Sequence, residues 1–559
     1  MVGSSGGRNK GAFRSRPTWT DQLAKDLMKR PLLLTGFMAT GKSTVGREVA
    51  TQAGVPFFDL DELVELESGL SVRQLFAERG EPAFRALERR VLLALLREHA
   101  SAAPVVALGG GALLDRNLRI EVLGEAVVVA LTASPPEIVR RLQGEPGAQD
   151  KRPLLAEADP AARVAELLEA RQVAYQECHG TVFCDHQSPS QIAGQVLAIW
   201  KRGGVAVAAG AASYTVVIGD QLIEAQLGRL LGKPSGALLV SDTTVEPLHG
   251  GPALVALSGL GCKSTEVLLT PGEQHKTLDG LRPIFQGAAS LGLDRQGVLV
   301  GLGGGVVTDM TGFAAATWMR GVRWIGVPTT LLAMVDASVG GKTAVDFQEA
   351  KNAVGAFWQP CGVICDVSVL GTETERMFRG ALSEVVKTAL IGDPALLELV
   401  ERRQEPLLAR DPATLTEVVE RSIRVKARIV SLDEREQGLR ATLNLGHTIG
   451  HALESAGGYT ALTHGEAVSL GLVAALRLGE RLGHTPRQLT ERVRRLLSAL
   501  ALPHRLERAA LERATALLRL DKKRARDSVK FVFAQDVGQV MTASVPLAEL
   551  SEWTPQLAD

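Results

Sequence analysis

The sequence is poor in cysteine, in aromatic residues and in net charge, and each shortage excludes a class of protein. Five cysteines among 559 residues form no Cys-x-x-Cys pair, which argues against a disulfide scaffold and favours a reducing cytoplasm. Lysine and arginine (62) balance aspartate and glutamate (62), so no overall field would attract nucleic acid or an acidic membrane. No run of eighteen apolar residues is present, so no membrane-spanning segment is predicted.

Glycine and small apolar residues are abundant. The chain holds 58 glycines and is 45% hydrophobic, which favours α/β units joined by tight turns. Its length predicts two or three domains rather than one core. We expect a largely disordered tail over residues 1–30, a first unit over 31–200, a small-residue linker over 201–213, an α/β unit over 214–375 and a helical unit over 376–559.

Three of the ten histidines gather between residues 447 and 464. His447 and His451 are four apart in a segment with helical spacing of apolar residues, so both imidazoles lie on one helix face. His464 follows a Gly-Gly-Tyr-Thr turn and begins another apolar segment, a return that could bring it beside the first two. The His-Glu-x-x-His pattern of zinc proteases is absent.

A catalytic zinc site often combines two histidines with one carboxylate and keeps a position open for substrate. The best carboxylate candidate is Glu384, in an otherwise apolar helix that carries Lys387 on the same face. Buried charges in such a place are costly unless they are paired or bound to a metal. The sequence therefore predicts a metal site that includes Glu384.

From about residue 214 to the C-terminus, the chain resembles 3-dehydroquinate synthase. The motifs that carry this resemblance occur in one order, at 303–309, 327–332, 336–343 (DASVGGKT), 351–357, 444–451 (NLGHTIGH) and 464–466. The resemblance implies an α/β NAD-binding half, an all-helical metal-binding half and an active site in the cleft. It also implies a homodimer.

The resemblance assigns roles in the helical half residue by residue. Glu384, His447 and His464 match the ligands of Zn²⁺ (or Co²⁺), His451 matches a phosphate-binding histidine that transfers protons, and Glu436 matches the candidate base. The contacts to phosphate or ring match Arg320 (from a partner subunit), Lys342, Asn352, Lys387 and Asn444, and the carboxylate contacts match Lys426, Arg440 and Lys522 or Lys523.

Strand and helix patterns before residue 376 predict a nucleotide site. Asp242 ends a predicted strand, where a carboxylate can accept ribose hydroxyls, and the strand 298–302 runs into glycines and a helix N-terminus that can accept a pyrophosphate. The spacing is not that of G-x-G-x-x-G. The resemblance implies that NAD contacts Asp242, Glu273, Lys276, Gly304, Gly305, Val306, Asp309, Thr329, Thr330, Lys342, Lys351 and Thr372.

The reaction that this resemblance implies converts 3-deoxy-arabino-heptulosonate 7-phosphate into 3-dehydroquinate with release of phosphate. The metal would hold two hydroxyls of the substrate while NAD⁺ oxidises one carbon, and the hydride would return later, so NAD is recycled.

Near the N-terminus, an apolar strand at 31–35 leads into GFMATGKST, the full Walker A pattern. Backbone N–H groups of such a loop hold phosphates, Lys42 reaches the β and γ oxygens, and Ser43 offers a hydroxyl to Mg²⁺. The predicted ATP-binding residues are Gly36, Ala39, Thr40, Gly41, Lys42, Ser43 and Thr44.

The segment from about 32 to 200 resembles shikimate kinase, with a P-loop fold of a parallel sheet and flanking helices. Asp59 and Asp61 end a predicted strand two residues apart. The resemblance implies Asp59 near Mg²⁺, Asp61 on the shikimate hydroxyls, Gly110 on the ring, Arg85 and Arg171 on the carboxylate, and Arg152, in a lid-like stretch, on the ATP phosphates.

Three alternatives stay open. The C-terminal unit could be a related sugar-phosphate cyclase, which without a substrate carboxylate would not need Lys426 and Arg440. It could be a metal-dependent polyol dehydrogenase, which would release NADH. The chain could also be an inactive scaffold, which the intact Lys42, Ser43 and metal ligands argue against. We expect the two sites to act independently, because the synthase product is not the kinase substrate.

Overall fold

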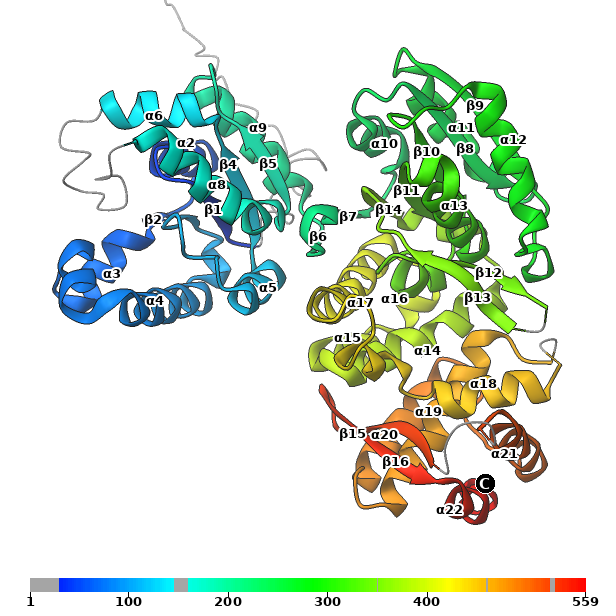
Figure 1. Cartoon of the computed structure of the whole chain (residues 1–559). Coiled ribbons are helices and arrows are strands. Elements are labelled where there is room, and N and C mark those ends of the chain that lie inside the picture. Colours follow the sequence, from blue (N-terminus) through cyan, green and yellow to red (C-terminus); the bar gives the residue numbers. More distant parts are fainter. Residues whose placement is uncertain (1–29, 145–158, 349, 459–460, 523–527) are drawn as a thin grey trace, which may run out of the picture. The chain divides into compact units, whose positions relative to one another are not determined.

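The computed structural model describes residues 30–144, 159–348, 350–458, 461–522 and 528–559 (Figure 1). The chain divides into two compact units. The first consists of Met1–Ala112, Glu125–Val164 and Val182–Gly203, and the second of Leu113–Gly124, Ala165–Thr181 and Gly204–Asp559. The predicted tail before residue 30 and most of the predicted lid with Arg152 lie outside the described residues.

A five-stranded sheet dominates the N-terminal part of the chain, in the order β2-β3-β1-β4-β5. Neighbours among the first four are parallel. The strands are β1 (Leu32–Gly36), β2 (Phe57–Asp59), β3 (Val105–Ala107), β4 (Val127–Thr132) and β5 (Gly180–Phe183). The helices are α2 (Lys42–Ala53), α3 (Leu60–Ser68), α4 (Val72–Glu98), α5 (Arg116–Glu125), α6 (Pro135–Gly144), α8 (Pro160–Gln176) and α9 (Pro189–Arg202).

The central strands of this sheet are continuous apolar runs. Every residue of β1 is buried, as are the first five of β4. Parallel strands covered by helices on both faces have this composition, because both faces of the sheet are removed from water. The carboxyl end of β1 then leads directly into the phosphate loop and α2.

A seven-stranded sheet forms the α/β part of the second unit, in the order β6-β7-β14-β11-β10-β8-β9. All neighbours are parallel except β6 and β7. The strands are β6 (Val205–Val207), β7 (Tyr214–Gly219), β8 (Gly236–Asp242), β9 (Lys263–Leu269), β10 (Val298–Gly303), β11 (Arg323–Pro328) and β14 (Gly362–Asp366). Its helices are α10 (Ile223–Leu231), α11 (Glu246–Ser258), α12 (Arg282–Leu291) and α13 (Gly305–Thr317).

The segment 201–213, which the sequence suggests to be a linker, is in part a strand. Val205–Val207 forms β6 and pairs antiparallel with β7 at the edge of the sheet. Val205 and Val207 are buried, so this low-complexity segment gains enough from burial and pairing to become ordered.

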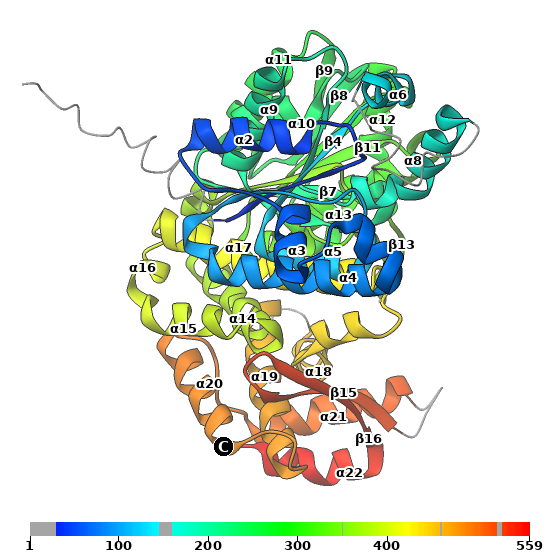
Figure 2. The ribbon, with the colours of Figure 1, turned by 90° about the vertical axis from the view of Figure 1, so that its left-hand side faces the viewer.

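The C-terminal half is helical but not all-helical. Its helices are α14 (Glu375–Gly392), α15 (Pro394–Arg402), α16 (Gln404–Leu408), α17 (Pro412–Leu432), α18 (His447–Ala456), α19 (His464–Arg481), α20 (Arg487–Ala499), α21 (Arg508–Lys522) and α22 (Leu547–Trp553). An antiparallel hairpin of β15 (Ser528–Asp536) and β16 (Gln539–Pro546) corrects the all-helical prediction (Figure 2). Val529, Phe531 and Phe533 alternate along β15 and are buried, which is the strand pattern that the prediction missed.

A second hairpin, β12 (Lys342–Phe347) and β13 (Ala350–Phe357), lies in the chain between the sheet strands β11 and β14 and carries several predicted site residues. The predicted fold class, a P-loop kinase fold followed by an α/β and a helical part, is confirmed. Among the described residues, no helix combines the length and apolar character that crossing a membrane requires.

Three helices of the second unit touch through glycine. A Cβ atom at Gly465 of α19 would collide with the Gly380 carbonyl of α14, and one at Gly471 would collide with the Gly446 carbonyl before α18. Helix backbones can come this close only where no side chain separates them. This packing brings the first residues of α18 and α19 close to the middle of α14.

Candidate active sites

The phosphate loop has the geometry of a nucleotide site. Gly36 and Gly41 have φ of 137° and 92°, a region that favours glycine, and a Cβ at Gly36 would collide with the Leu131 carbonyl. Thr40 Oγ1 donates to the Phe37 carbonyl at 2.8 Å and closes the loop. Lys42 Nζ donates to the carbonyls of Gly36 (3.0 Å) and Phe37 (2.9 Å), so the ammonium lies across the loop.

The predicted magnesium ligands meet at the start of α2. Ser43 Oγ donates to Asp59 Oδ2 at 2.6 Å, and the other Asp59 oxygen caps α3 by accepting from the Asp61 N–H at 3.1 Å. A hydroxyl and a carboxylate beside a phosphate loop are hard oxygen ligands, which fit Mg²⁺ held together with phosphate oxygens.

Asp61 lies in the first turn of α3, not on the strand, because β2 ends at Asp59. This corrects the prediction that both carboxylates lie on the strand. Burial, followed by the neighbouring charge of Asp59, raises the pKa of the Asp61 carboxyl. A carboxyl with a raised pKa suits proton exchange with a substrate hydroxyl.

Arg85 pairs with Glu88, a residue that the sequence analysis missed. Arg85 Nη1 lies 2.7 Å from Glu88 Oε2, and Glu88 is only 2% exposed. A Cβ at Gly109 would lie 2.7 Å from Glu88 Oε1 and 3.0 Å from Asp61 Oδ1, and one at Gly111 would collide with the Arg85 guanidinium. The glycines on either side of Gly110 thus make room for this charged cluster, and the i,i+3 spacing of Arg85 and Glu88 was the signal that could have found it.

Three further arginines lie in different surroundings. Arg141 of α6, which the sequence analysis missed, donates to the carbonyls of Ala39 (3.3 Å), Thr40 (3.4 Å) and Cys184 (2.9 Å), so it braces the phosphate loop. Arg171 lies on α8, in the stretch that belongs to the second compact unit. Arg152 lies outside the described residues.

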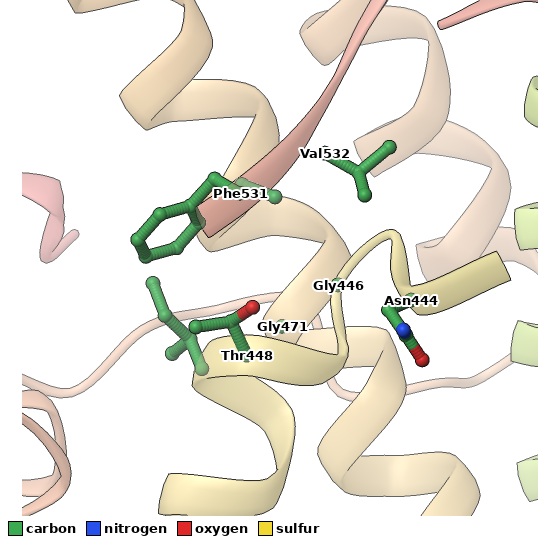
Figure 3. A pocket seen from close by; sticks show the side chains of 8 residues that line it. Asn444, Gly446, Thr448, Gly471, Phe531 and Val532 are labelled. Atoms are coloured by element: carbon green, nitrogen blue, oxygen red, sulfur yellow. The ribbon is translucent and has the colours of Figure 1, made fainter. Parts of the chain in front are cut away.

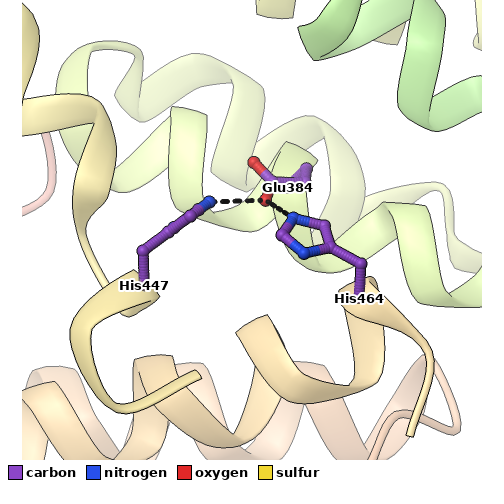
Figure 4. A group of neighbouring side chains, drawn as sticks. All are labelled: Glu384, His447 and His464. Carbon is purple, nitrogen blue, oxygen red and sulfur yellow. Dashed lines mark ion pairs between the residues drawn. The ribbon is translucent and has the colours of Figure 1, made fainter. Parts of the chain in front are cut away.

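In the second unit, the three predicted metal ligands come together. Glu384 is in the middle of α14, and His447 and His464 are the first residues of α18 and α19. Nε2 of His447 lies 3.4 Å and Nε2 of His464 lies 3.5 Å from Glu384 Oε1 (Figure 4). Their ligand atoms all lie within 4.8 Å of one another.

The residues of this cluster fit a divalent cation. Glu384 is 1% exposed, and both its oxygens lack a hydrogen-bond partner among the described residues, although Lys387 makes a close ion pair with it. A buried carboxylate with open lone pairs that faces two imidazoles is the donor set of a zinc or cobalt site.

Charges around the cluster set its protonation. Burial opposes ionisation of Glu384, but Lys387 and then His447 hold its pKa well below the usual value. Burial, together with Lys387, lowers the pKa of His447 to about 3 and leaves this imidazole neutral, as a metal ligand must be. Burial also lowers the pKa of His451, whose ring centroid lies 5.1 Å from that of His447.

A chain of charged groups continues from the cluster. Lys426 Nζ donates to Asp336 at both the side chain and the backbone carbonyl, each at 2.5 Å. Burial opposes ionisation of Asp336, but Lys426 and Lys387 lower its pKa to about 2. Asp336 is a site residue that the analysis missed, although it opens the motif DASVGGKT.

The predicted base lies at the hairpin β12–β13. Glu436 makes a close ion pair with Lys342 and accepts from Asn444 Nδ2 at 3.3 Å, so three predicted residues meet. Glu436 has a φ of 57°, a left-handed conformation that few non-glycine residues adopt. The buried Arg440 instead donates to backbone carbonyls, those of Gly340 (3.1 Å) and Glu434 (2.5 Å).

At the α/β end, β10 runs into α13 with Gly304 as its first cap residue, so Gly305 and Val306 present the helix N-terminus that the NAD prediction requires. Lys276 Nζ joins Asp309 Oδ2 (2.7 Å) and Asn352 Oδ1 (2.5 Å). The other predicted NAD contacts lie at the ends of strands or shortly after them: Asp242 ends β8, Glu273 follows β9, Thr329 and Thr330 follow β11, and Thr372 bonds His249 beyond β14.

The remaining predictions fall on helix and hairpin ends. Lys351, at the start of β13, pairs with Glu454 of α18 at 2.9 Å. Met319 and Arg320, after α13, have φ of 50° and 65°. Lys522 is the last residue of α21, and Lys523 lies outside the described residues.

A small pocket lies between the start of α18, the helix α19 and the strand β15 (Figure 3). It is lined by Asn444, Gly446, Thr448, Ile449, Gly471, Ala475, Phe531 and Val532. No acidic, basic or histidine side chain faces it, so we regard it as a packing gap beside the metal cluster.

Comparison with known families confirms both resemblances. Family models match as shikimate kinase over residues 38–201, as the N-terminal part of 3-dehydroquinate synthase over 266–380 and as its C-terminal part over 381–524. A curated 3-dehydroquinate synthase of Geobacter metallireducens is 42% identical over 351 residues, which cover 63% of this chain and 93% of that protein.

Two solved structures share the fold of the C-terminal part. A 2-deoxy-scyllo-inosose synthase, complexed with carbaglucose-6-phosphate, NAD⁺ and Co²⁺, has a TM-score of 0.58 at 24% identity and covers 63% of this chain and 99% of its own. A 2-epi-5-epi-valiolone synthase of Streptomyces hygroscopicus, with NAD⁺ and Zn²⁺ bound, has a TM-score of 0.56 at 26% identity and covers 62% of this chain and 96% of its own.

Proposed function

We propose that this chain, which belongs to the 3-dehydroquinate synthase family and matches shikimate kinase over residues 38–201, is a bifunctional enzyme of the shikimate pathway. Its C-terminal part would convert 3-deoxy-arabino-heptulosonate 7-phosphate into 3-dehydroquinate and phosphate, and its N-terminal part would phosphorylate shikimate with ATP. The observation that carries the proposal is the buried cluster of Glu384, His447 and His464 beside an α/β sheet with a glycine-capped helix.

In the synthase, Glu384, His447 and His464 would hold Zn²⁺ or Co²⁺, which polarises a substrate hydroxyl when bound. NAD⁺, held at the N-terminus of α13 and by Asp242, Asp309 and Lys276, supplies a reversible hydride acceptor. Lys342, Asn352 and Lys387 carry positive charge and amide donors for the phosphate and ring. Lys426 and Arg440 would bind the substrate carboxylate, with the Asp336 pair holding Lys426 in place.

Proton transfer falls to Glu436 and His451. Burial opposes ionisation of Glu436, but Lys342 lowers its pKa, so it is a carboxylate that can accept a proton. The lowered pKa of His451 keeps its imidazole neutral, so that it could exchange a proton with the departing phosphate.

In the kinase, Lys42 and the loop amides would bind the ATP phosphates, and Ser43 and Asp59 would hold Mg²⁺. Asp61 would accept the proton of the shikimate hydroxyl, while Arg85, held by Glu88, binds the carboxylate. Positioning and charge neutralisation then provide most of the rate of phosphoryl transfer.

We also propose a homodimer in which Arg320 reaches the site of a partner subunit. Met319 and Arg320 both adopt positive φ, which is costly and is retained where a side chain must point in one direction. A reducing cytoplasm fits the chain, since Cys184, Cys262, Cys361 and Cys365 are free thiols and burial raises the pKa of Cys184 to about 11.

The test is an assay of phosphate release from 3-deoxy-arabino-heptulosonate 7-phosphate by Co²⁺-loaded protein with catalytic NAD⁺. We expect carbocycle formation without net NADH, abolished in His447→Ala. Turnover only of a heptose phosphate without a carboxylate would assign the unit to related cyclases. Accumulation of NADH would assign it to polyol dehydrogenases. ADP formation that depends on shikimate, and is lost in Lys42→Met, tests the kinase separately.

A further inference from the structure

Glu454 lies on α18 between two groups that the proposed synthase uses, yet nothing assigns it a role. It is 7% exposed. One carboxylate oxygen, Oε2, lies 3.5 Å from Nδ1 of His464, and the other, Oε1, accepts from Lys351 Nζ at 2.9 Å. Each oxygen therefore serves a different partner from a different element, α19 on one side and β13 on the other.

The contact with His464 fixes which way its ring faces. Nδ1 of His464 points to Glu454 while Nε2 points to Glu384 at 3.5 Å. A carboxylate on the nitrogen remote from the metal selects the tautomer of a ligand imidazole, fixes the ring orientation and raises its basicity. Glu454 supplies such a carboxylate to Nδ1 of His464.

The contact with Lys351 reaches the hairpin β12–β13. Lys351 precedes Asn352, whose amide oxygen accepts from Lys276, and Lys276 in turn pairs with Asp309 of α13. Polar contacts thus run from His464 through Glu454 to Lys351, and one step along the backbone of β13 leads to the contacts of Asn352, Lys276 and Asp309 at the proposed NAD site. Such a series can transmit a change in one site to the other when its members move together.

We propose that Glu454 is a positioning residue that orients His464 for the metal and, through Lys351, couples metal binding to NAD binding. The proposal rests on the proposed function, because it takes Glu384, His447 and His464 as the metal ligands. By reciprocity, bound metal then changes NAD affinity by the same factor by which bound NAD changes metal affinity.

A competing arrangement uses some of the same atoms. His451, Glu454 and His464 also have ligand atoms within 4.8 Å of one another, so Glu454 could itself be a metal ligand. The cluster with Glu384 is favoured, because one oxygen of Glu384 faces the Nε2 atoms of both His447 and His464, whereas Glu454 has an ion pair with His464 alone of the two.

The experiment measures Co²⁺ affinity, by chelator competition, and the visible spectrum of the Co²⁺-loaded full chain, in wild type and in Glu454→Ala, Glu454→Asp, Glu384→Gln and Lys351→Met. For Glu454→Ala we expect affinity to fall about 10- to 100-fold with an altered spectrum, and for Glu454→Asp partial recovery. Lys351→Met is the matched control: it removes the other partner of Glu454 and should leave Co²⁺ affinity within about threefold. Metal-free melting curves check that each variant folds.

NAD⁺ binding is then measured for each variant without and with Co²⁺. In wild type the two Kd values should differ by about fivefold or more, and this ratio should approach one in Glu454→Ala and in Lys351→Met. Unchanged Co²⁺ affinity in Glu454→Ala, or a wild-type ratio of one, would overturn the proposal. Loss of Co²⁺ binding in Glu454→Ala but not in Glu384→Gln would make Glu454 a ligand and would overturn it too. Retained Co²⁺ binding in both Glu454→Ala and Glu384→Gln would instead contradict the assignment of the metal ligands on which the proposed function rests.

Discussion

The phosphate loop and the metal cluster are built in opposite ways. In the loop, residues 36–44 are adjacent in sequence, and local backbone geometry alone places Lys42 and Ser43 beside the strand end. In the metal cluster, Glu384, His447 and His464 come from three helices and meet only because α14, α18 and α19 pack through glycine. A site of the first kind depends on turn chemistry, and one of the second kind depends on tertiary packing.

The largest effects should come from removing one central group in each site. Lys42→Met should reduce kinase turnover by on the order of 10³-fold, because the phosphate charge loses its main compensation, while synthase turnover stays unchanged. His447→Ala should do the reverse. Steady-state assays of both activities on each variant check this, and a drop of both activities in either variant would show that the two sites are not independent.

Substitution of glycine should distinguish a site that depends on helix packing from one that depends on turn geometry. Gly465→Ala places a methyl group against the Gly380 carbonyl, so it should cost about 1–3 kcal/mol of stability and weaken Co²⁺ binding as α19 moves away from α14. The matched change Gly41→Ala meets only Val45 Cγ2 at 3.9 Å, so its cost is backbone strain at φ 92° of about 1 kcal/mol.

Thermal unfolding and chelator competition on both variants measure these effects. Gly41→Ala should weaken ATP binding and leave the metal affinity of the second unit as it was. Equal loss of Co²⁺ affinity in both variants would contradict the view that helix packing positions His464.

The kinase site also contains an ion pair within one helix, Arg85 and Glu88 of α4, which lies against Gly109 and Gly111 of another segment. Glu88→Gln removes the charge that holds the guanidinium, so KM for shikimate should rise about tenfold with a smaller change in kcat. The neighbouring, more exposed Glu81 also contacts Arg85, and Glu81→Gln is the control, with a change of about twofold or less. A kcat effect larger than the KM effect would mean that Glu88 acts on the reacting groups.

The smallest effect concerns a carboxylate that lacks the cations of Glu384. Burial raises the pKa of Glu373 to about 7, so between pH 4.5 and 7 the folded state binds more protons than the unfolded state, and stability falls as pH rises through this range. Glu373→Gln should therefore be neutral at pH 5 and stabilise the protein by about 1 kcal/mol at pH 8, after allowance for solvent contact.

Unfolding midpoints at the two pH values test this. Glu375→Gln is the control: the nearby Arg379 lowers the pKa of Glu375, so its removal should give no gain at pH 8. A gain from Glu373→Gln that is equal at both pH values would show that ionisation is not the cause.

The amino-acid sequence by itself determined the phosphate loop, the two fold classes and the three residues that we propose as metal ligands. Those features rest on adjacent residues, on continuous apolar strands or on ordered motifs, which are local in the chain. The sequence named Lys342 and Glu436 as separate candidates and did not predict that they pair. It also placed Asp61 on a strand, because the exact end of β2 depends on which groups cap α3.

Only the tertiary structure decided what lies beside each predicted group. The spacing of Glu88 from Arg85 and the place of Asp336 in its motif are local signals, but they show neither the burial of Glu88 nor the pairing of Asp336 with Lys426. Glu454 has no such local signal, and its importance comes from its contacts with Lys351 and His464. The strand β6 in the low-complexity segment and the hairpin β15–β16 likewise exist because neighbouring elements bury their apolar faces. The physical reason is that burial and charge pairing are properties of three-dimensional neighbours, which sequence spacing does not record.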